Sequence, residues 1–233
     1  MSTLLPAAPT PTQLASPAPT PRLLMTRAEF EAAAENPETR VEWLGVTGET
    51  RDGDPLGLVW PRFGFRDDGS YAMPTLRHAT INMNVVLTLG GQFDREAWDF
   101  FTQDAEVACG TGRTRLPDAV LAKRPAEYVP HPRGEAGERL LLSPAVCFEV
   151  TSRGTASVDR SEKPGDYLSI STVTDYLVID QALRRVLHHR RAAGTGPPTW
   201  DVTTLDGPDD VVALAAPAVM LPLAEIYRGV RFD

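Results

Sequence analysis

Residues 143–154, SPAVCFEVTSRG, have the composition of a buried β-strand with one charged residue inside it. Residues 146–148 form the apolar centre of this stretch, and Val150 continues the apolar run after Glu149. An isolated ionised carboxylate in an apolar site is so costly that its pKa shifts or it finds a partner. Glu149 therefore either points to a wet face or meets a cationic group.

The composition of the chain predicts one globular domain after a disordered tail. The chain has 233 residues, of which 42% are hydrophobic and 23% are charged, which is ordinary for a soluble protein. Residues 1–22 are rich in Pro, Ala, Thr and Ser and cannot bury enough apolar surface to order, so we expect a disordered tail there and a single domain over residues 23–233. We see no membrane-spanning run and no secretory signal.

Charge and cysteine content narrow the functional classes. The formal net charge of −8 argues against non-specific affinity for nucleic acid, which rests on a basic surface. Two cysteines, Cys109 and Cys147, are too few for a disulfide framework and lie in apolar runs. We expect both to be reduced, buried thiols in a cytoplasmic protein.

Two helices and a hairpin are predicted in the first part of the chain. Thr26 and Glu29 have capping-box spacing at the start of a helix over residues 25–36. Residues 39–53 and 56–63 read as paired strands with a turn between them. A second helix is expected over residues 75–93, with Thr75 as its cap. Four residues are expected to line its buried face: Leu76, Met83, Val86 and Leu87.

The second part of the chain is dominated by strand patterns. Strands are predicted over residues 96–109, 115–123, 143–151 and 173–180, and a hairpin over residues 184–191 and 199–205. Short helices are predicted over residues 161–172 and 221–229, and a loop over residues 124–139. The order predicts an α/β domain: a mixed β-sheet flanked by helices, with an N-terminal helix and hairpin and a β-rich C-terminal end.

Several common catalytic motifs are absent. The GTG at residues 110–112 lacks the ending of a phosphate loop, and neither a Gly-x-Ser-x-Gly nor a Cys-x-x-Cys occurs. His188 and His189 are adjacent in a predicted strand, so they face opposite sides and are expected to be ordinary strand residues. These absences argue against nucleotide triphosphatases, serine hydrolases and zinc fingers.

A pair of carboxylates remains as the candidate site. Asp118 begins one apolar strand, and Glu149 lies in the next. If these strands pair, the two carboxylates can converge at one end of the sheet and form a hard-oxygen site for Mg²⁺ or Mn²⁺. The carbonyl of Val150 and waters would complete the shell. A metal would then explain how Glu149 sits in an apolar strand.

These residues also resemble a known family. The chain from about Met25 to its C-terminus is similar to the Uma-two family of restriction-endonuclease-like proteins, in the PD-(D/E)XK nuclease superfamily. Weaker similarity includes RVEWLGVTGE (residues 40–49) and a helix-start histidine, His78. The main resemblance is carried by Pro117, Asp118, Asp159, Lys163 and Tyr167, with PAVCFEVTS (residues 144–152) and TVTDYLVID (residues 172–180).

The resemblance implies a metal-dependent phosphodiester hydrolase. By it, Asp118 and Glu149 would hold Mg²⁺, and Lys163 would be the basic member of the catalytic site. The superfamily motif puts a lysine two residues after the glutamate, where this chain has Thr151; in the Uma-two version the lysine lies on the following helix, as Lys163 does. Pro164 departs from the pattern, because proline is tolerated only in a first helical turn.

Other residues are candidates for accessory roles. His78 could pack on the sheet or reach the site, Tyr167 could be core or catalytic, and Glu42 could add a carboxylate or be a hairpin charge. Four arginines could form a phosphate-contacting rim or could simply be solvated: Arg113, Arg115, Arg153 and Arg160.

Three functional hypotheses follow. The first is a Mg²⁺-dependent endonuclease acting on DNA. The second is a non-enzymatic binding or interaction module with the same fold, which the net charge favours. The third is a metal-dependent phosphoesterase for a small substrate. A homodimer is compatible with the first hypothesis, because duplex cutters pair two sites by two-fold symmetry.

Overall fold

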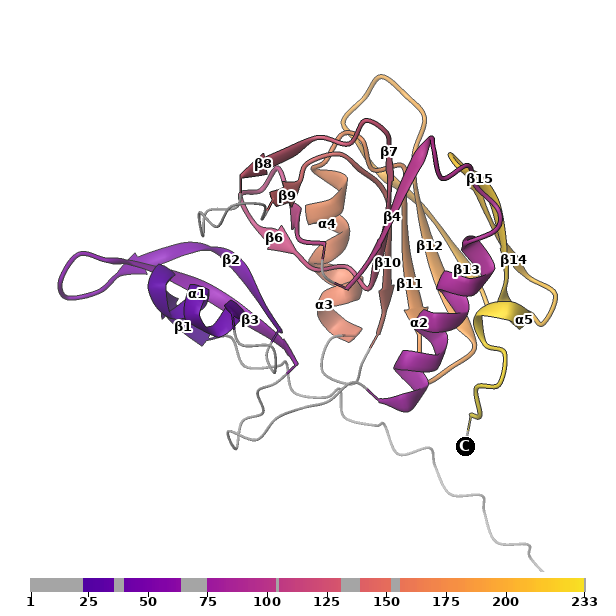
Figure 1. Ribbon diagram of the computed structural model, residues 1–233, viewed down its shortest axis with the longest axis horizontal. Helices are drawn as coiled ribbons and strands as arrows, with labels where there is room; N and C mark the ends of the chain where they lie inside the picture. The colour runs from indigo at the N-terminus through magenta and orange to yellow at the C-terminus, as the bar shows by residue number, and fades with distance from the viewer. Residues whose placement is uncertain are drawn as a thin grey trace, which may run out of the picture.

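The computed structural model describes residues 23–35, 40–63, 75–103, 105–130, 139–151 and 156–232 (Figure 1). The expected disordered tail, residues 1–22, lies outside these ranges. Within them, no helix is long and apolar enough to cross a membrane.

A six-stranded mixed sheet forms the centre of the fold, as the sequence predicts (Figure 1). Strand β10 pairs in parallel with β11 and antiparallel with β7, and the other pairs are antiparallel. In spatial order the strands are β13 (Trp200–Leu205), β12 (Arg185–Arg191), β11 (Asp175–Asp180), β10 (Pro144–Val150), β7 (Ala119–Lys123) and β4 (Trp98–Thr102).

The N-terminal helix and hairpin form as predicted. Thr26 and Glu29 make the capping box: the Thr26 amide donates to Glu29 Oε2 at 2.7 Å, and the Glu29 amide donates to Thr26 Oγ1 at 3.2 Å. The elements of this part are β1 (Leu23–Thr26), α1 (Arg27–Glu35), β2 (Arg40–Glu49) and β3 (Pro55–Phe63), with the strands in the order β1-β3-β2.

The remaining strands form two smaller sheets. One is a C-terminal hairpin of β14 (Val211–Ala215) and β15 (Ala218–Pro222). The other has the order β6-β5-β9-β8 and consists of β5 (Val107–Ala108), β6 (Thr114–Arg115), β8 (Tyr128–Pro130) and β9 (Arg139–Leu141). The predicted strands over residues 96–109 and 115–123 are therefore wrong as single elements, since each is divided between this sheet and the six-stranded one. Likewise, the predicted loop over residues 124–139 contains β8.

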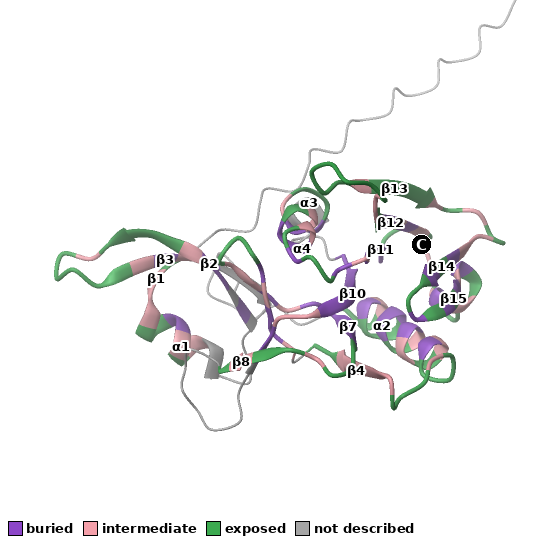
Figure 2. Ribbon diagram, turned by 90° about the horizontal axis from the view of Figure 1, so that it is seen from above, coloured by how far each residue is buried: buried purple, intermediate pink, exposed green. Residues whose placement is uncertain are grey.

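Four further helices lie against the six-stranded sheet or beside it. They are α2 (Leu76–Leu89), α3 (Ala156–Ser161), α4 (Lys163–Leu168) and α5 (Leu223–Ile226). Helices α3 and α4 cover one face, whereas α2, α5 and the β14–β15 hairpin cover the other (Figures 1 and 2). The helix predicted over residues 161–172 corresponds to α4, and a second short helix, α3, precedes it.

The buried face of α2 differs from the prediction. Thr75 caps the helix as expected, its Oγ1 accepting from the His78 amide at 3.1 Å. However, Leu76, Met83 and Leu87 are exposed, at 89%, 57% and 70%. The buried residues are His78, Ile81, Asn82, Val85 and Leu89. The helix is apolar on more than one face, so periodicity alone could not select the face that meets the sheet.

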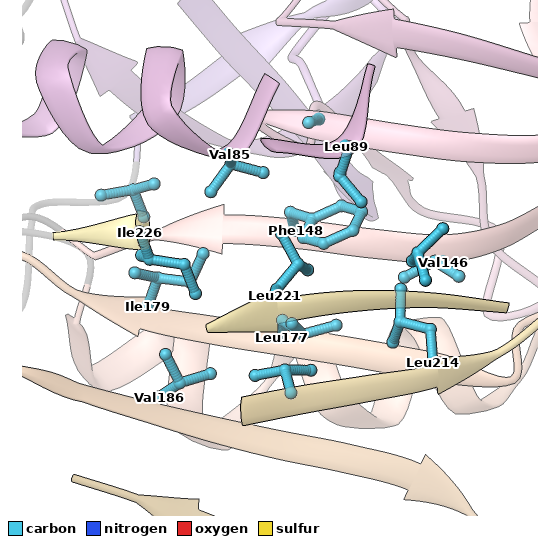
Figure 3. Close-up of a cluster of buried hydrophobic side chains, with 14 of the residues drawn as sticks. Val85, Leu89, Val146, Phe148, Leu177, Ile179, Val186, Leu214, Leu221 and Ile226 are labelled. Carbon is cyan, nitrogen blue, oxygen red and sulfur yellow. The ribbon is translucent and has the colours of Figure 1, made fainter. Parts of the chain in front are cut away.

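The two faces of β10 enter different cores. Val146, Phe148 and Val150 pack in an apolar cluster with α2, α5 and the β14–β15 hairpin, which Figure 3 shows in part. Cys147 packs on the opposite face with α4. The period of two along a strand explains this division and places Glu149 on the same face as Cys147.

Two minor predictions are confirmed. Cys147 on β10 and Cys109, which follows β5, are both buried and are not joined in a disulfide. His188 and His189 have different surroundings: His188 Nε2 lies 2.6 Å from Asp175 Oδ1, whereas the His189 ring packs between Tyr176 and Trp200.

Candidate functional site

Glu149 is fully buried, and a lysine compensates its charge. Lys163 Nζ lies 2.6 Å from Glu149 Oε1, and neither side chain is exposed to solvent. The hydroxyl of Tyr167 donates to the same oxygen at 2.9 Å. The cation that allows a carboxylate inside this apolar strand is therefore the ammonium of Lys163.

A second carboxylate lies at the same ammonium. Asp159 Oδ1 is 3.0 Å from Lys163 Nζ, and the Asp159 side chain is 1% exposed. The Asp159 backbone carbonyl accepts a hydrogen bond from the hydroxyl of Tyr176 at 2.8 Å, which ties α3 to β11. Burial chiefly raises the pKa of Tyr176 well above its usual value, and the charges of Glu149 and Asp159 raise it further. This face of the sheet thus buries two acids around one base.

The start of α4 determines where Lys163 points. Lys163 is the first residue of the helix and Pro164 the next, so the proline occupies the first turn, where its missing amide hydrogen costs nothing. The indole nitrogen of Trp200 donates to the Pro164 carbonyl at 2.8 Å. Proline at this position is therefore compatible with the burial of the lysine.

A buried ion pair fixes the middle of α4. The guanidinium of Arg115 is fully buried, and its Nε donates to Asp166 Oδ2 at 2.8 Å. Thr111 Oγ1 donates to the other carboxylate oxygen of Asp166 at 2.9 Å. These contacts hold β6 and the turn that precedes it, which contains Thr111, against α4, the helix that carries Lys163 and Tyr167.

Asp118 directly precedes β7, the strand that pairs with β10, and lies beside the end of β10 that carries Glu149. Asp118 is 5% exposed. Its Oδ2 accepts a hydrogen bond from the Val150 amide at 2.7 Å, and its own amide donates to the Phe148 carbonyl at 3.0 Å. The two strands therefore pair as expected, and Asp118 is bonded to the residue that follows Glu149.

His78 reaches this carboxylate from the other face. Its Nε2 lies 3.3 Å from Asp118 Oδ2, and the residue is 7% exposed. The cap at Thr75 sets the first turn of α2 and so places the imidazole. Of the two alternatives for His78, the structure favours contact with Asp118.

The predicted arginine rim is only partly compatible with the structure. Arg115 is buried against Asp166, so its predicted contact with phosphate does not fit its position. Arg113 lies 3.5 Å from Asp166, and Arg160 pairs with Asp180; both remain partly exposed. Arg153 and the side chain of Glu42 lie outside the described residues.

The donor chemistry at Asp118 and Glu149 suits a hard divalent cation. Carboxylates are the ligands that Mg²⁺ and Mn²⁺ prefer. Within the described ranges, no group of three or more His, Cys, Asp or Glu residues could hold a metal ion. Backbone carbonyls or waters would thus have to complete a shell that these two acids begin.

Two features of the site were missed at the level of sequence. Asp159 belongs to the family pattern, and its spacing of four residues from Lys163 brings the two side chains together because α4 begins two residues after α3 ends. The Arg115–Asp166 pair had no local signal, because its members are 51 residues apart.

The mixed sheet flanked by helices is the fold of a restriction-endonuclease-like α/β protein. A model of the family described as "Putative restriction endonuclease" (Uma2) matches residues 61–223, so the chain belongs to this family. The predicted family is confirmed, and residues 40–49 lie outside the match.

Two individual proteins are also similar. The chain is 23% identical over 131 residues to the "Uncharacterized protein sll1609" of Synechocystis sp., which covers 56% of this chain and 70% of that protein. A crystal structure of "a putative nuclease belonging to DUF820" from Anabaena variabilis superposes with a TM-score of 0.55 at 16% identity, covering 87% of this chain and 97% of that one. At this identity the superposition supports the fold alone.

Proposed function

We propose that the protein is a Mg²⁺- or Mn²⁺-dependent endonuclease that hydrolyses phosphodiester bonds in DNA. The observation that carries the proposal is the buried Glu149–Lys163 pair beside Asp118, at the end of two paired central strands. Family membership supports the reaction class.

The proposed roles follow from the side chains. Asp118 and Glu149 would hold the cation, with the Val150 carbonyl as a further oxygen ligand. When bound, the metal would supply an activated water and polarise the phosphate. The ammonium of Lys163 would stabilise negative charge that develops on the phosphoryl oxygens. Tyr167 would hold the Glu149 carboxylate, and His78 would hold that of Asp118.

The buried charges themselves support a chemical role. A buried ion pair contributes little net stability, because the desolvation of both charges offsets their attraction, and apolar replacements are often as stable. Stability alone thus gives no reason to place Glu149, Asp159 and Lys163 inside a core. Chemistry at a phosphodiester does require such groups.

Two observations favour the non-enzymatic module as the alternative. The net charge is −8, and neither Glu149 nor Lys163 is exposed to solvent. An enzyme of this kind must admit a cation and a phosphate to these groups. We also propose that residues 23–233 form a single cytoplasmic domain. The proposal that this domain acts as a homodimer on duplex DNA depends on the nuclease activity.

Cleavage of supercoiled plasmid tests the proposal. The purified protein is incubated with Mg²⁺ or Mn²⁺, beside Asp118→Asn, Glu149→Gln and a matched carboxylate control, Asp99→Asn, whose partner Arg124 is on the surface. We expect cleavage by the parent and the control, and a loss on the order of 100-fold or more in the two site variants. If the parent protein binds metal but does not cleave the plasmid, the result would support the non-enzymatic interaction module instead. Hydrolysis of bis-p-nitrophenyl phosphate without plasmid cleavage would instead support the small-substrate phosphoesterase.

A further inference from the structure

The lysine at the site is unusual within this chain. The sequence contains 21 arginines and only two lysines, Lys123 and Lys163. Lys123 is exposed, whereas Lys163 is fully buried. An ammonium is a compact charge with three donors on a flexible stem, so it can move between acceptors in a way that a planar guanidinium cannot.

Two acceptors for this ammonium come from different elements of the fold. Glu149 Oε1 is 2.6 Å away on β10, and Asp159 Oδ1 is 3.0 Å away on α3. Glu149 Oε1 also accepts from Tyr167. Within the described part of the chain, by contrast, neither carboxylate oxygen of Asp159 accepts a well-aligned hydrogen bond, although both are buried. Asp159 therefore has unused acceptor capacity directed at the lysine.

We propose that Asp159 is a positioning residue that takes over the ammonium of Lys163 when Glu149 turns its carboxylate to a divalent cation. The inference rests on the proposed metal-dependent function. Glu149 cannot serve a metal and keep its full attraction for the lysine, because its charge is then shared. A buried ammonium that loses its carboxylate is strongly destabilised. Asp159, already at ion-pair distance, removes that penalty and so frees Glu149 to bind the metal.

Hydrogen bonds around Asp159 and Lys163 hold the backbone in place, so the exchange requires only a small movement of the lysine side chain. The Tyr176 hydroxyl anchors the Asp159 backbone to β11, and the Trp200 indole anchors the Pro164 carbonyl next to Lys163. Both helices can therefore stay in place while the lysine side chain alone shifts from one carboxylate to the other.

Mn²⁺ binding measured by calorimetry tests the proposal without any cleavage assay. We expect Asp159→Asn to weaken Mn²⁺ binding by about tenfold or more, as loss of a residue that orients a metal ligand does. Glu162→Gln is the matched control, since it removes an acid next to Lys163 that pairs with Arg113 instead, and its affinity should stay within about twofold of the parent. Unchanged affinity in Asp159→Asn would overturn the proposal.

A double-mutant cycle separates positioning from direct ligation. If Asp159 acts through the lysine, Asp159→Asn should have no effect on Mn²⁺ affinity in a Lys163→Met background. An equal loss in that background would show that Asp159 binds the metal itself or only supports the fold, and would overturn the inference.

A spectroscopic readout covers the case in which Lys163→Met does not fold. With ¹⁵N-labelled lysine the chain gives only two side-chain signals, and that of Lys123 is the internal control. Diamagnetic Mg²⁺ should shift the Lys163 signal in the parent and in Asp159→Glu, and should leave it unshifted in Asp159→Asn at the same concentration. A Lys163 signal that ignores Mg²⁺ in the parent would also overturn the inference. A parent that shifts and binds but cleaves no DNA would count against the proposed function only.

Discussion

The two faces of the six-stranded sheet are both buried, but they bury different chemistry. On the α2 face, Val146, Phe148 and Val150 belong to a large apolar cluster, which Figure 3 shows in part. On the α4 face, Glu149 and Lys163 lie among aromatic and aliphatic neighbours without solvent contact. Apolar burial yields roughly 25 cal/mol per Å², whereas a buried ion pair is close to neutral. The α4 face has an apolar core of its own, and what distinguishes it is the pair of buried acids around one ammonium.

The largest expected effect comes from removing one charge on the α4 face. Lys163→Met leaves Glu149 and Asp159 buried without the ammonium, so we expect the free energy of unfolding to fall by about 3–5 kcal/mol. Urea unfolding measures this. Adding Glu149→Gln and Asp159→Asn to the same chain should recover more than half of the loss. A single-variant cost well under 1 kcal/mol would mean that the ion pair is not formed as the structure shows.

Truncating an apolar side chain on the α2 face should lower the free energy of unfolding by almost as much, without changing metal binding. Leu177 is fully buried in the apolar cluster, so Leu177→Ala should reduce the free energy of unfolding by about 3 kcal/mol through lost burial and a cavity. Mn²⁺ affinity of the folded protein should not change. If it falls in parallel with stability, the two faces are coupled, and the division between them is wrong.

The α4 face should also be the acid-sensitive one. Burial lowers the pKa of His189 to about 4, from its ordinary 6.5. The unfolded chain therefore takes up a proton near pH 6.5 and the folded chain only near pH 4, so stability is complete above about pH 6.5 and is lost as the pH falls toward 4. We expect a loss on the order of 2 kcal/mol across this window.

His189→Phe provides the comparison for that pH dependence, because phenylalanine can keep the ring contacts with Tyr176 and Trp200. Its unfolding free energy, measured in urea at several pH values, should be flatter between pH 6.5 and 4 than that of the parent. The lowered pKa of Asp175 adds a loss of stability only from about pH 5 downward, and this loss is common to both proteins. Identical slopes for both proteins would exclude His189 as the cause.

The smallest effect is expected at the N-terminal cap of α2. Thr75→Ala removes the side-chain acceptor for the His78 amide, and we expect a loss of about 1 kcal/mol in unfolding free energy. Thr75→Ser keeps the hydroxyl and should stay within a few tenths of a kcal/mol of the parent. Thermal unfolding of the three proteins compares them directly, and equal melting temperatures would show that the cap is dispensable.

Local signals allowed much of the fold to be predicted. The capping box of α1 and the period-two patterns depend on neighbours within a few residues, which is why α1, β10, β11 and the β12–β13 hairpin follow the sequence. The strands over residues 96–109 and 115–123 change sheets midway, and nothing local marks that change. The buried face of α2 depends on where β10 and α5 lie, which the helix itself does not encode.

The sequence indicates candidate residues for the site but not their partners. Asp118 and Glu149 stand out because each begins or interrupts an apolar run, and Lys163 is added by the family resemblance. That Lys163 meets Asp159 as well as Glu149 depends on how α3 lies over the sheet. The burial of Arg115 likewise depends on a carboxylate 51 residues away, so a rim of four similar arginines could not be sorted from the sequence.

Because the chain has only two lysines, an amine reagent can distinguish them in the folded protein. Lys123 offers an exposed side-chain amine, whereas Lys163 is shielded on all sides. An acylating reagent should therefore label Lys123 at once and Lys163 only when α4 detaches from the sheet. Mass spectrometry of the Lys163 peptide over time would then report how often the region around the site opens in the native protein, as hydrogen exchange does for backbone amides.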